Sequence, residues 1–282
     1  MNIAVIGAGY VGLVSGTCFA EIGVKVTCID TDASKIKMLQ AGKIPIFEPH
    51  LEAMVARNML EGRLNFESTF GNFLGDADVI FIAVGTPTDL PTGGINTSYV
   101  ESAARFIAPM LDNYTVIVNK STVPIGTAEQ VSKVISEGNE NAIFDVASNP
   151  EFLREGSAID DFMKPDRIIV GVDNERPKKV LEQIYQPLVN EDVPLVMMDT
   201  KSAELTKYGA NAFLATKVAF INEMAALCDS TGANVKSVAK GIGLDKRIGP
   251  RFLNPGPGVG GSCFPKDTRA LVNIAQDNNT EA

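Results

Sequence analysis

The sequence predicts an α/β protein with a Rossmann-like, doubly wound parallel sheet, followed by a long central helix and a helical dimerisation region. Short apolar runs alternate with amphipathic helical stretches in the first part of the chain, and a glycine-rich turn follows the first run. Strand-like runs stop after Asp199, where a stretch of helix-forming residues begins. We therefore expect an α/β domain over residues 1–199 and a helical domain over residues 200–282.

The expected strands are short apolar runs, and helical patterns lie between most of them. The strands are expected at Asn2–Ile6, Lys25–Ile29, Val79–Val84, Thr115–Asn119, Ile143–Ala147, Arg167–Val172 and Leu195–Met198. After a first helix that runs through Ile22, further helices are expected near Ser34–Gln40, Glu48–Asn58, Tyr99–Met110, Ala128–Ser136 and Pro177–Leu188. This alternation is typical of a parallel sheet with helices on both faces.

The first strand leads directly into Gly7-Ala8-Gly9-Tyr10-Val11-Gly12, which has the G-x-G-x-x-G spacing of a dinucleotide-binding turn. The second strand ends in Asp30, an acid suited to the ribose hydroxyls of NAD and unfavourable for the extra phosphate of NADP. Lys35 is either a contact on the adenosine side or a solvated lysine. The alternative is that the glycines form only a turn and Asp30 only caps a helix. The strand–turn–helix–strand–acid order favours NAD.

The stretch Ser202–Asp229 contains helix formers and no proline, which predicts one helix about 40 Å long. Its many Ala, Phe, Val, Ile and Met residues require burial along much of its length. The helix should therefore join two domains or pack against a second subunit.

Composition excludes several classes of protein. The net charge of −9 argues against nucleic acid as a partner, and no apolar run is long enough to span a membrane. The N-terminus has no apolar, cleavable leader, and the four cysteines lack the spacing of a metal or disulfide site, so we expect a cytoplasmic protein without a metal. Cys18, Cys28 and Cys228 fit apolar packing, which leaves Cys263 as the reactive candidate.

Three expected strands are followed by unusual polar segments. These are Val84-Gly85-Thr86-Pro87, Ser121-Thr122-Val123-Pro124 and Asn149-Pro150-Glu151-Phe152-Leu153-Arg154-Glu155-Gly156. Ordinary turn chemistry explains each alone, and two glutamates four residues apart are often a solvated helix face. Parallel strands bring all three segments to the edge that carries the dinucleotide turn, which favours a ligand site.

A reactive cysteine is indicated by Gly256-Pro257-Gly258-Val259-Gly260-Gly261-Ser262-Cys263-Phe264-Pro265-Lys266-Asp267. A nearby cation or helix N-terminus activates a thiol, and glycines allow the backbone to approach a ligand closely. Asp267 could instead be a helix-start residue for Thr268–Ala275. The only histidine, His50, lies early in the chain, which argues against a histidine base.

The chain resembles the nucleotide-sugar dehydrogenases of the UDP-glucose 6-dehydrogenase type. The resemblance covers GAGYVG (7–12), VGTPT (84–88), STVP (121–124), NPEFLREG (149–156), Lys207, Asn211 and GPGVGGSCFPKDT (256–268). NPEFLREG and GGSCFPKD are the specific motifs, and GDP-mannose dehydrogenase shares much of the pattern.

The resemblance implies a four-electron oxidation of UDP-glucose to UDP-glucuronate with NAD, as in polysaccharide biosynthesis. Cys263 would add to the intermediate aldehyde as a thiohemiacetal, whose oxidation gives a thioester that water hydrolyses. Lys207 would stabilise oxyanions, and Asn211, one helical turn later, would assist it and contact the sugar. Thr122 and Asp267 would position water, and Glu151 would serve thioester hydrolysis.

The remaining residues are assigned by the same resemblance. Cofactor contacts are expected from Thr86, Pro87, Thr122, Glu155 and Lys266, beside the glycine turn. Substrate contacts are expected from Glu151, Phe152, Leu153, Arg154, Glu155, Lys207, Asn211, Phe252, Leu253, Asn254, Pro255, Gly256 and Gly260. Phe252 and Leu253 taken singly could be ordinary core. Arg247 resembles an arginine that the family sends into a neighbouring subunit's site, which implies a homodimer.

The family continues after Lys266-Asp267-Thr268 with a UDP-binding domain, and this chain stops at Ala282. We therefore expect a fragment that binds NAD but turns over UDP-glucose poorly or not at all. Three alternatives stay open: another nucleotide sugar such as GDP-mannose, a simple two-electron dehydrogenase without need of a thiol, and a non-catalytic NAD-binding module.

Overall fold

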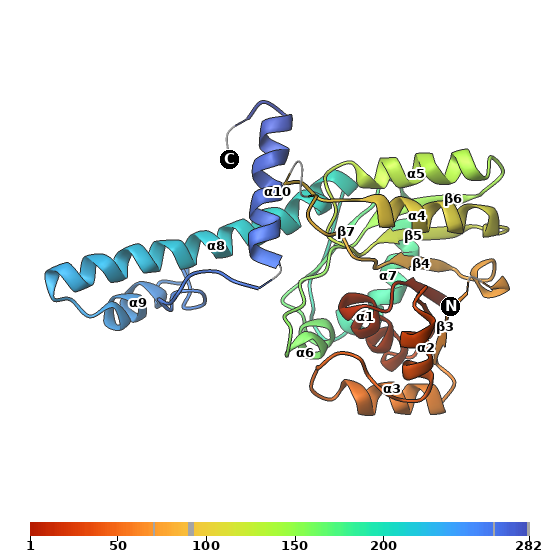
Figure 1. Ribbon diagram of the computed structural model, residues 1–282, viewed down its shortest axis with the longest axis horizontal. Coiled ribbons are helices and arrows are strands. Elements are labelled where there is room, and N and C mark those ends of the chain that lie inside the picture. Colours follow the sequence, from red (N-terminus) through yellow and green to blue (C-terminus); the bar gives the residue numbers. More distant parts are fainter. Residues whose placement is uncertain (70, 90–92, 262, 281–282) are drawn as a thin grey trace. The chain divides into compact units, whose positions relative to one another are not determined.

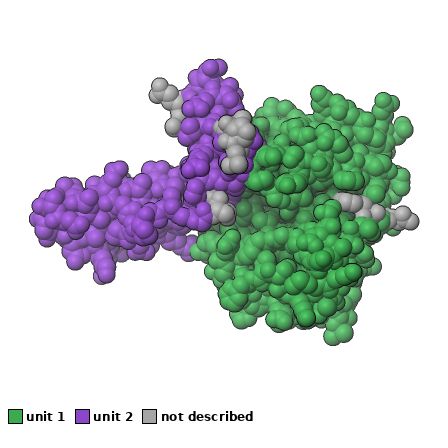
Figure 2. All heavy atoms as spheres, viewed as in Figure 1, with its two compact units in different colours: residues 1–87, 96–205 green, residues 88–95, 206–282 purple. Residues whose placement is uncertain are grey.

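A computed structural model describes residues 1–69, 71–89, 93–261 and 263–280 of the chain. The chain forms two compact units, shown in different colours in Figure 2. The α/β unit comprises Met1–Pro87 and Asn96–Leu205, and the helical unit comprises Thr88–Ile95 and Thr206–Ala282.

The described residues of the α/β unit form one eight-stranded sheet with the order β3-β2-β1-β4-β5-β6-β7-β8. The strands are β1 (Asn2–Ile6), β2 (Lys25–Ile29), β3 (Leu64–Glu67), β4 (Val79–Ile82), β5 (Thr115–Asn119), β6 (Phe144–Ser148), β7 (Ile168–Gly171) and β8 (Leu195–Met198). Strand β3 was not predicted, since it has only four residues of alternating burial. The α/β class and the Rossmann-like plan are confirmed.

The prediction of a wholly parallel sheet was wrong at one position. β6 and β7 pair antiparallel, through Ser148 and Gly171, so β7 and β8 run opposite to the other strands. The chain leaves β6 through a loop at the carboxyl edge and then forms only α6 (Ala158–Met163). Six residues of helix span about 9 Å, which is too short to return the chain along β6 to the opposite edge.

Alternating side chains of each strand enter two hydrophobic cores, one on each face of the sheet. In β1, for example, Ile3 and Val5 face one core and Ala4 and Ile6 face the other. The first core is covered by α1 (Tyr10–Glu21), α2 (Ala33–Gln40), α3 (Leu51–Leu60), α6 and α7 (Glu175–Val189). The second is covered by α4 (Ser98–Ile107), the 3₁₀ helix Ala108–Met110 and α5 (Thr127–Gly138), with α4 and α5 side by side in Figure 1.

The long helix α8 (Thr200–Thr231) starts in the α/β unit and continues into the helical unit. Its 32 residues extend about 48 Å. The expected burial along its length is not met within the single chain, because Phe213, Phe220 and Leu227 are 66%, 45% and 54% exposed. No described helix is long and apolar enough to cross a membrane.

The helical unit also contains α9 (Val235–Gly243), which was not predicted, and α10 (Cys263–Asp277). The predicted start of the last helix at Thr268 was wrong, because α10 begins at Cys263. Pro265 in its first turn is compatible with this start, since the first backbone N–H groups of a helix need no partner within the helix. Asp267 therefore lies inside the helix and is not its cap.

Candidate active site

The glycine turn connects the end of β1 to the start of α1. Gly7 has φ 99°, and a Cβ there would lie 2.6 Å from the carbonyl oxygen of Ala83. A Cβ at Gly12 would overlap the carbonyl oxygen of Gly7, so this glycine permits the close approach of α1. No atom lies within 4 Å of a Cβ built at Gly9. The open space beside Gly9 fits a ligand that approaches the backbone at the N-terminus of α1, as a dinucleotide pyrophosphate does.

Asp30 follows β2 directly and is tied to the glycine turn. Its Oδ2 accepts hydrogen bonds from the backbone N–H of Ala8 at 2.9 Å and from Lys35 Nζ at 2.7 Å. Burial acts to raise the pKa of Asp30, but these bonds and one from the N–H of Asp32 hold it below its ordinary value. The alternative that Asp30 caps a helix is excluded, because the cap of α2 is Asp32. The Asp30 carboxylate is thus held directly beside the glycine turn, with its charged form favoured.

The polar segments after β4, β5 and β6 lie at one edge of the sheet, as predicted, because these three strands are adjacent and parallel. Ser121 Oγ donates to the carbonyl oxygen of Val84 at 2.7 Å and so ties two of the segments together. Thr86 and Thr122 are half-buried, and Pro87 is exposed. This edge also carries the glycine turn, since β1 is parallel to β4.

The loop after β6 is held at its beginning by a buried lysine. Lys120 Nζ donates to Asn149 Oδ1 at 2.9 Å, and the hydroxyl of Tyr185 donates to the same oxygen at 2.6 Å. Asn149 Nδ2 in turn donates to the carbonyl oxygen of Ile169 on β7 at 2.8 Å. The direction of the chain is therefore set just before Glu151.

Glu151 and Glu155 lie in this loop and not on a helix, which excludes the solvated helix face as an explanation for the pair. Glu151 is buried, and its Oε2 accepts a hydrogen bond from the N–H of Leu153 at 2.6 Å. Glu155 is exposed. Two carboxylates in one loop thus have different surroundings, one fixed and one open to solvent.

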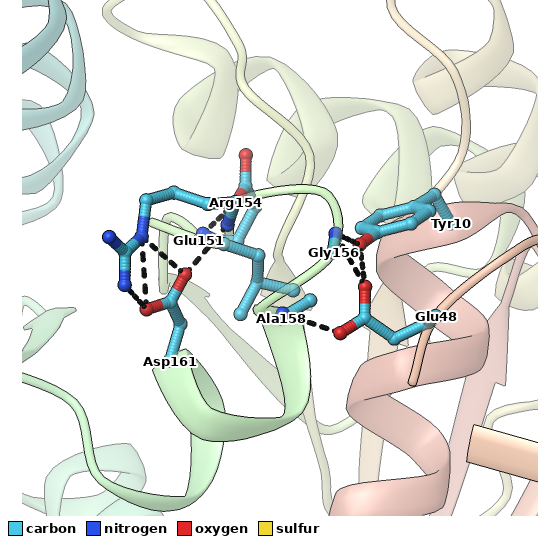
Figure 3. A network of polar contacts seen from close by, with 8 residues as sticks. Tyr10, Glu48, Glu151, Arg154, Gly156, Ala158 and Asp161 are labelled. Carbon is cyan, nitrogen blue, oxygen red and sulfur yellow. Dashed lines mark hydrogen bonds and ion pairs between the residues drawn. The ribbon is translucent and has the colours of Figure 1, made fainter. Parts of the chain in front are cut away.

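Arg154, a predicted substrate contact, forms an ion pair within the α/β unit (Figure 3). Its guanidinium contacts Asp161 on α6 at 2.5 Å, and its backbone N–H donates to the same carboxylate at 2.8 Å. The guanidinium of Arg167 stacks on the ring of Phe152, 3.7 Å from the ring centre. Both contacts connect the loop to the segment that follows it.

Sequence reasoning missed Glu48, which holds the other side of this loop (Figure 3). Its carboxylate is buried and accepts hydrogen bonds from the hydroxyl of Tyr10 and from the N–H groups of Gly156 and Ala158, both at 2.8 Å. Burial, together with the bond to Glu48, raises the pKa of Tyr10 well above its ordinary value. Glu48 had been placed at the start of a helix, but α3 starts at Leu51. No local pattern indicates these distant partners.

In the helical unit, Lys207 and Asn211 occupy successive turns of α8, and both are buried. Asn211 Nδ2 donates to Asp267 Oδ2 on α10 at 2.6 Å. Lys266 Nζ pairs with Asp267 Oδ1 at 2.7 Å, and Asp267 is 1% exposed. These four residues place two lysine cations, an amide and a carboxylate on two helices of one unit.

The loop before α10 contains the remaining predicted substrate residues. Phe252 has φ 65°, and its ring meets Phe264 edge-on at 6.1 Å between ring centres. Leu253 is 3% exposed, which agrees with the core alternative, whereas Asn254 and Gly260 are exposed and Pro255 is half-buried. The N–H of Gly256 donates to Asn222 Oδ1 on α8 at 2.8 Å. The loop is thus anchored to α8 while most of its glycines face solvent.

Cys263 and Arg247 are the two remaining predicted residues of the helical unit. Cys263 is the first residue of α10, and its side chain, like Ser262, lies outside the described part of the chain. Arg247 is 89% exposed and pairs with Asp245 at 2.6 Å. Among the described residues, no group of three or more His, Cys, Asp or Glu side chains could hold a metal ion.

Comparisons with known proteins agree with the resemblance of the sequence motifs. Residues 1–189 match the NAD binding domain of the UDP-glucose/GDP-mannose dehydrogenase family, and residues 201–282 match its central domain. The chain is 55% identical over 282 residues to UDP-glucose 6-dehydrogenase of Rhizobium meliloti, covering 99% of the chain and 64% of that enzyme. It is 51% identical to UDP-glucose 6-dehydrogenase TuaD of Bacillus subtilis, covering 98% of the chain and 59% of that enzyme.

Solved structures show the same relationship. The UDP-glucose dehydrogenase of Pyrobaculum islandicum has a TM-score of 0.95 at 42% identity, over 99% of this chain and 65% of its own. GDP-mannose dehydrogenase of Pseudomonas aeruginosa has a TM-score of 0.83 at 34% identity, over 100% of this chain and 66% of its own. A Mycobacterium tuberculosis 3-hydroxyisobutyrate dehydrogenase, at 15% identity and a TM-score of 0.65, shares the fold alone.

This chain therefore spans about 64% of the length of the Rhizobium meliloti enzyme. The motifs, the glycine turn with its acid and the two matched domains agree on one assignment. The chain belongs to the UDP-glucose/GDP-mannose dehydrogenase family, and residues 1–189 are its NAD-binding domain.

Proposed function

We propose that this chain belongs to a UDP-glucose 6-dehydrogenase, which oxidises UDP-glucose to UDP-glucuronate. The observation that carries the proposal is the cluster of Asn211, Lys266 and Asp267, in which the buried Asp267 is bonded to both partners. Lys266 and Asp267 follow Cys263 by three and four residues in the sequence. A dehydrogenase that stops at an aldehyde needs no thiol. An enzyme that continues to the acid does, because an aldehyde gains a transferable hydride only after a nucleophile has added to it.

NAD, when bound, supplies a hydride acceptor for each of the two oxidations. The Cys263 thiolate forms a C–S bond to the aldehyde carbon, and the resulting thiohemiacetal oxygen carries the developing negative charge. Loss of hydride from that carbon leaves a thioester on Cys263. Water then adds to the thioester carbon, the C–S bond breaks, and the two protons of water end on the released carboxylic acid and the Cys263 thiol.

Lys207 and Asn211 are suited to stabilise the oxyanions of these steps. Lys207 supplies a positive charge, and Asn211 uses one N–H of its amide on Asp267, which leaves a second N–H for an oxyanion. Because Asp267 is bonded on both oxygens, it fixes the direction of the Asn211 amide. A preorganised donor in a buried site can contribute about 3 kcal/mol of transition-state stabilisation.

Proton transfer and water positioning are assigned to carboxylates and a hydroxyl. We assign thioester hydrolysis to Glu151, whose buried carboxylate is held by the N–H of Leu153. Thr122 and Asp267 are proposed to position water. Substrate contacts are proposed for Phe152, Leu153, Arg154 and Glu155 of the same loop and for Phe252, Leu253, Asn254, Pro255, Gly256 and Gly260.

On the cofactor side, the glycine turn fits the pyrophosphate and Asp30 fits the ribose hydroxyls. Asp30 opposes an NADP phosphate by charge repulsion, and Lys35 keeps the acid in place at 2.7 Å. Thr86, Pro87, Thr122, Glu155 and Lys266 are proposed as further contacts toward the nicotinamide end.

We also propose a homodimer formed through α8. Phe213, Phe220 and Leu227 are seven residues apart and exposed, so they form an apolar stripe along one side of the helix. The exposed Arg247 would then reach a neighbouring subunit's site. Cys18, Cys28 and Cys228 are free thiols, which suits a reducing cytoplasm, the compartment we propose.

The test is the stoichiometry of the complete enzyme that contains this chain. Two NADH per UDP-glucose, with release of acid, are expected, and Cys263→Ser should stop the reaction at or before the aldehyde level. Unchanged turnover of Cys263→Ser would instead indicate a two-electron dehydrogenase. GDP-mannose is the alternative substrate, and faster oxidation of it than of UDP-glucose would overturn the choice of sugar nucleotide.

A further inference from the structure

We propose that Glu48 and Tyr10 are positioning residues that hold the loop Glu151–Ser157 in register with the glycine turn, so that NAD meets this loop already formed. The inference deepens the proposed function, since it rests on the assignment of Glu151 and Glu155 to the site. All the contacts that carry it lie within the α/β unit.

One carboxylate joins three distant segments of the chain. Glu48 precedes α3, Tyr10 is the first residue of α1, and Gly156 and Ala158 lie where the loop enters α6. Glu48 Oε2 accepts from the Tyr10 hydroxyl and, at 2.8 Å, from the N–H of Gly156, while its Oε1 accepts from the N–H of Ala158 at 2.8 Å. The N–H of Gly156 is also 3.2 Å from the Tyr10 hydroxyl oxygen. Both oxygens of the carboxylate are therefore used.

Burying a carboxylate without hydrogen-bond donors is unfavourable, so the buried Glu48 requires donors around it. Glu48 is 7% exposed, and its three donors are a phenol and two backbone N–H groups without full charge. The two N–H groups belong to the first turn of α6 and its approach, where a helix end lacks internal partners. Glu48 thus satisfies the start of α6 and fixes the loop that precedes it.

The position of Tyr10 connects this contact to the cofactor. Its backbone belongs to the turn that faces the pyrophosphate, and its hydroxyl reaches the loop that follows β6 (Figure 3). In a doubly wound sheet, a dinucleotide extends from the acid after β2 across the carboxyl edge toward β4 and the strands beyond it. The loop after β6 therefore lies on the nicotinamide side, away from Asp30.

A loop that is already ordered lowers the entropy lost when the ligand binds. Loosening the contact should lower the affinity of a ligand that reaches the loop. It should have little effect on the affinity of a ligand that lacks the nicotinamide ring. ADP-ribose carries the adenosine and the pyrophosphate of NAD without the nicotinamide ring. The ratio of the two affinities isolates the proposed role from a general loss of structure.

The chain offers a matched control in the same unit. The hydroxyl of Tyr114 donates to Asp145 Oδ2 at 2.8 Å, and the pKa of Tyr114 is raised by burial and by that bond, as in Tyr10. Tyr114 precedes β5, at the amino edge of the sheet and away from the glycine turn. Tyr114→Phe therefore removes a comparable bond without touching the loop.

The experiment is isothermal titration of the 282-residue chain with NAD and with ADP-ribose. Glu48→Gln replaces one carboxylate oxygen by an NH2 group, which is a donor and cannot accept the hydrogen bond it now faces. NAD affinity should therefore fall about tenfold and ADP-ribose affinity by less than about twofold. Tyr10→Phe should show the same selectivity with a fall of about threefold. Tyr114→Phe should change neither affinity.

An equal fall for both ligands, or no fall for NAD in both variants, would overturn the inference. If Glu48→Gln does not fold, as judged by circular dichroism, Tyr10→Phe carries the test alone. The titrations contain no sugar nucleotide, so their outcome is independent of whether the complete enzyme oxidises UDP-glucose.

Discussion

Asp267 is a buried carboxylate whose removal should destabilise the helical unit. Asp267→Ala would leave Lys266 Nζ and Asn211 Nδ2 without an acceptor that now lies 2.7 Å and 2.6 Å away. At an effective dielectric constant of about 20, unit charges at this separation attract by about 6 kcal/mol. Desolvation of the two ions offsets part of this, since Asp267 is 1% and Lys266 18% exposed.

Removing one partner of a buried pair is destabilising by about 3–5 kcal/mol. We expect Asp267→Ala to lie near the lower value, about 3 kcal/mol, because Lys266 can turn toward solvent. Asp267→Asn keeps an acceptor of the same shape and should lose about 1–2 kcal/mol. A loss of 3 kcal/mol corresponds to exchange about 150-fold faster wherever amides exchange by unfolding of the helical unit.

The assay is native-state hydrogen exchange of peptides from α8 and α10, which reports on the helical unit separately from the sheet. Asp245→Ala is the control in the same unit, because among the described residues that carboxylate pairs only with the exposed Arg247. It should leave exchange in both helices unchanged. If Asp267→Ala exchanges no faster than Asp245→Ala, the Asp267 carboxylate does not stabilise the helical unit.

Three further changes test other parts of the account. Asp30→Ala should weaken NAD binding by about tenfold or more in titration calorimetry. The pKa of Asp30 is lowered in the folded protein, so its contribution to folding stability should be present above the ordinary aspartate pKa. That contribution should be lost as the pH falls through the lowered pKa of the folded state. Burial raises the pKa of Glu204, which caps α5 through Gly126 and Ala128, so its ionisation disfavours folding. As the pH falls from above this raised pKa toward the ordinary glutamate pKa, the free energy of unfolding of wild type should rise relative to that of Glu204→Gln in urea titrations. A difference in unfolding free energy that does not change with pH would contradict this. Phe220→Glu should convert the proposed α8 homodimer to a monomer in sedimentation velocity, and a Phe220→Glu variant that stays dimeric would exclude the α8 stripe.

The elements with strong local patterns were predictable from the sequence. β1, β2, β5 and β8 have the predicted bounds, because each is a short apolar run between turn or helix signals. The glycine turn was recognised because its spacing has a direct steric cause at Gly7 and Gly12. The long helix was recognised because no proline or turn signal interrupts Ser202–Asp229.

The features that sequence reasoning missed depend on contacts between distant residues. Glu48 has an ordinary local context, and its partners are 38 residues before it and more than 100 after it. The reversal at β7 depends on the short α6, whose pattern of six residues is too brief to predict. Asp267 was open to a capping interpretation because the start of α10 lies in a glycine-rich segment without helical periodicity.

The most direct test of the central claim is the number of NADH molecules formed per UDP-glucose consumed by the complete enzyme that contains this chain. We expect two NADH and one UDP-glucuronate per sugar, with no turnover to acid by Cys263→Ser. One NADH per sugar with release of an aldehyde, or formation of acid by Cys263→Ser, would contradict it.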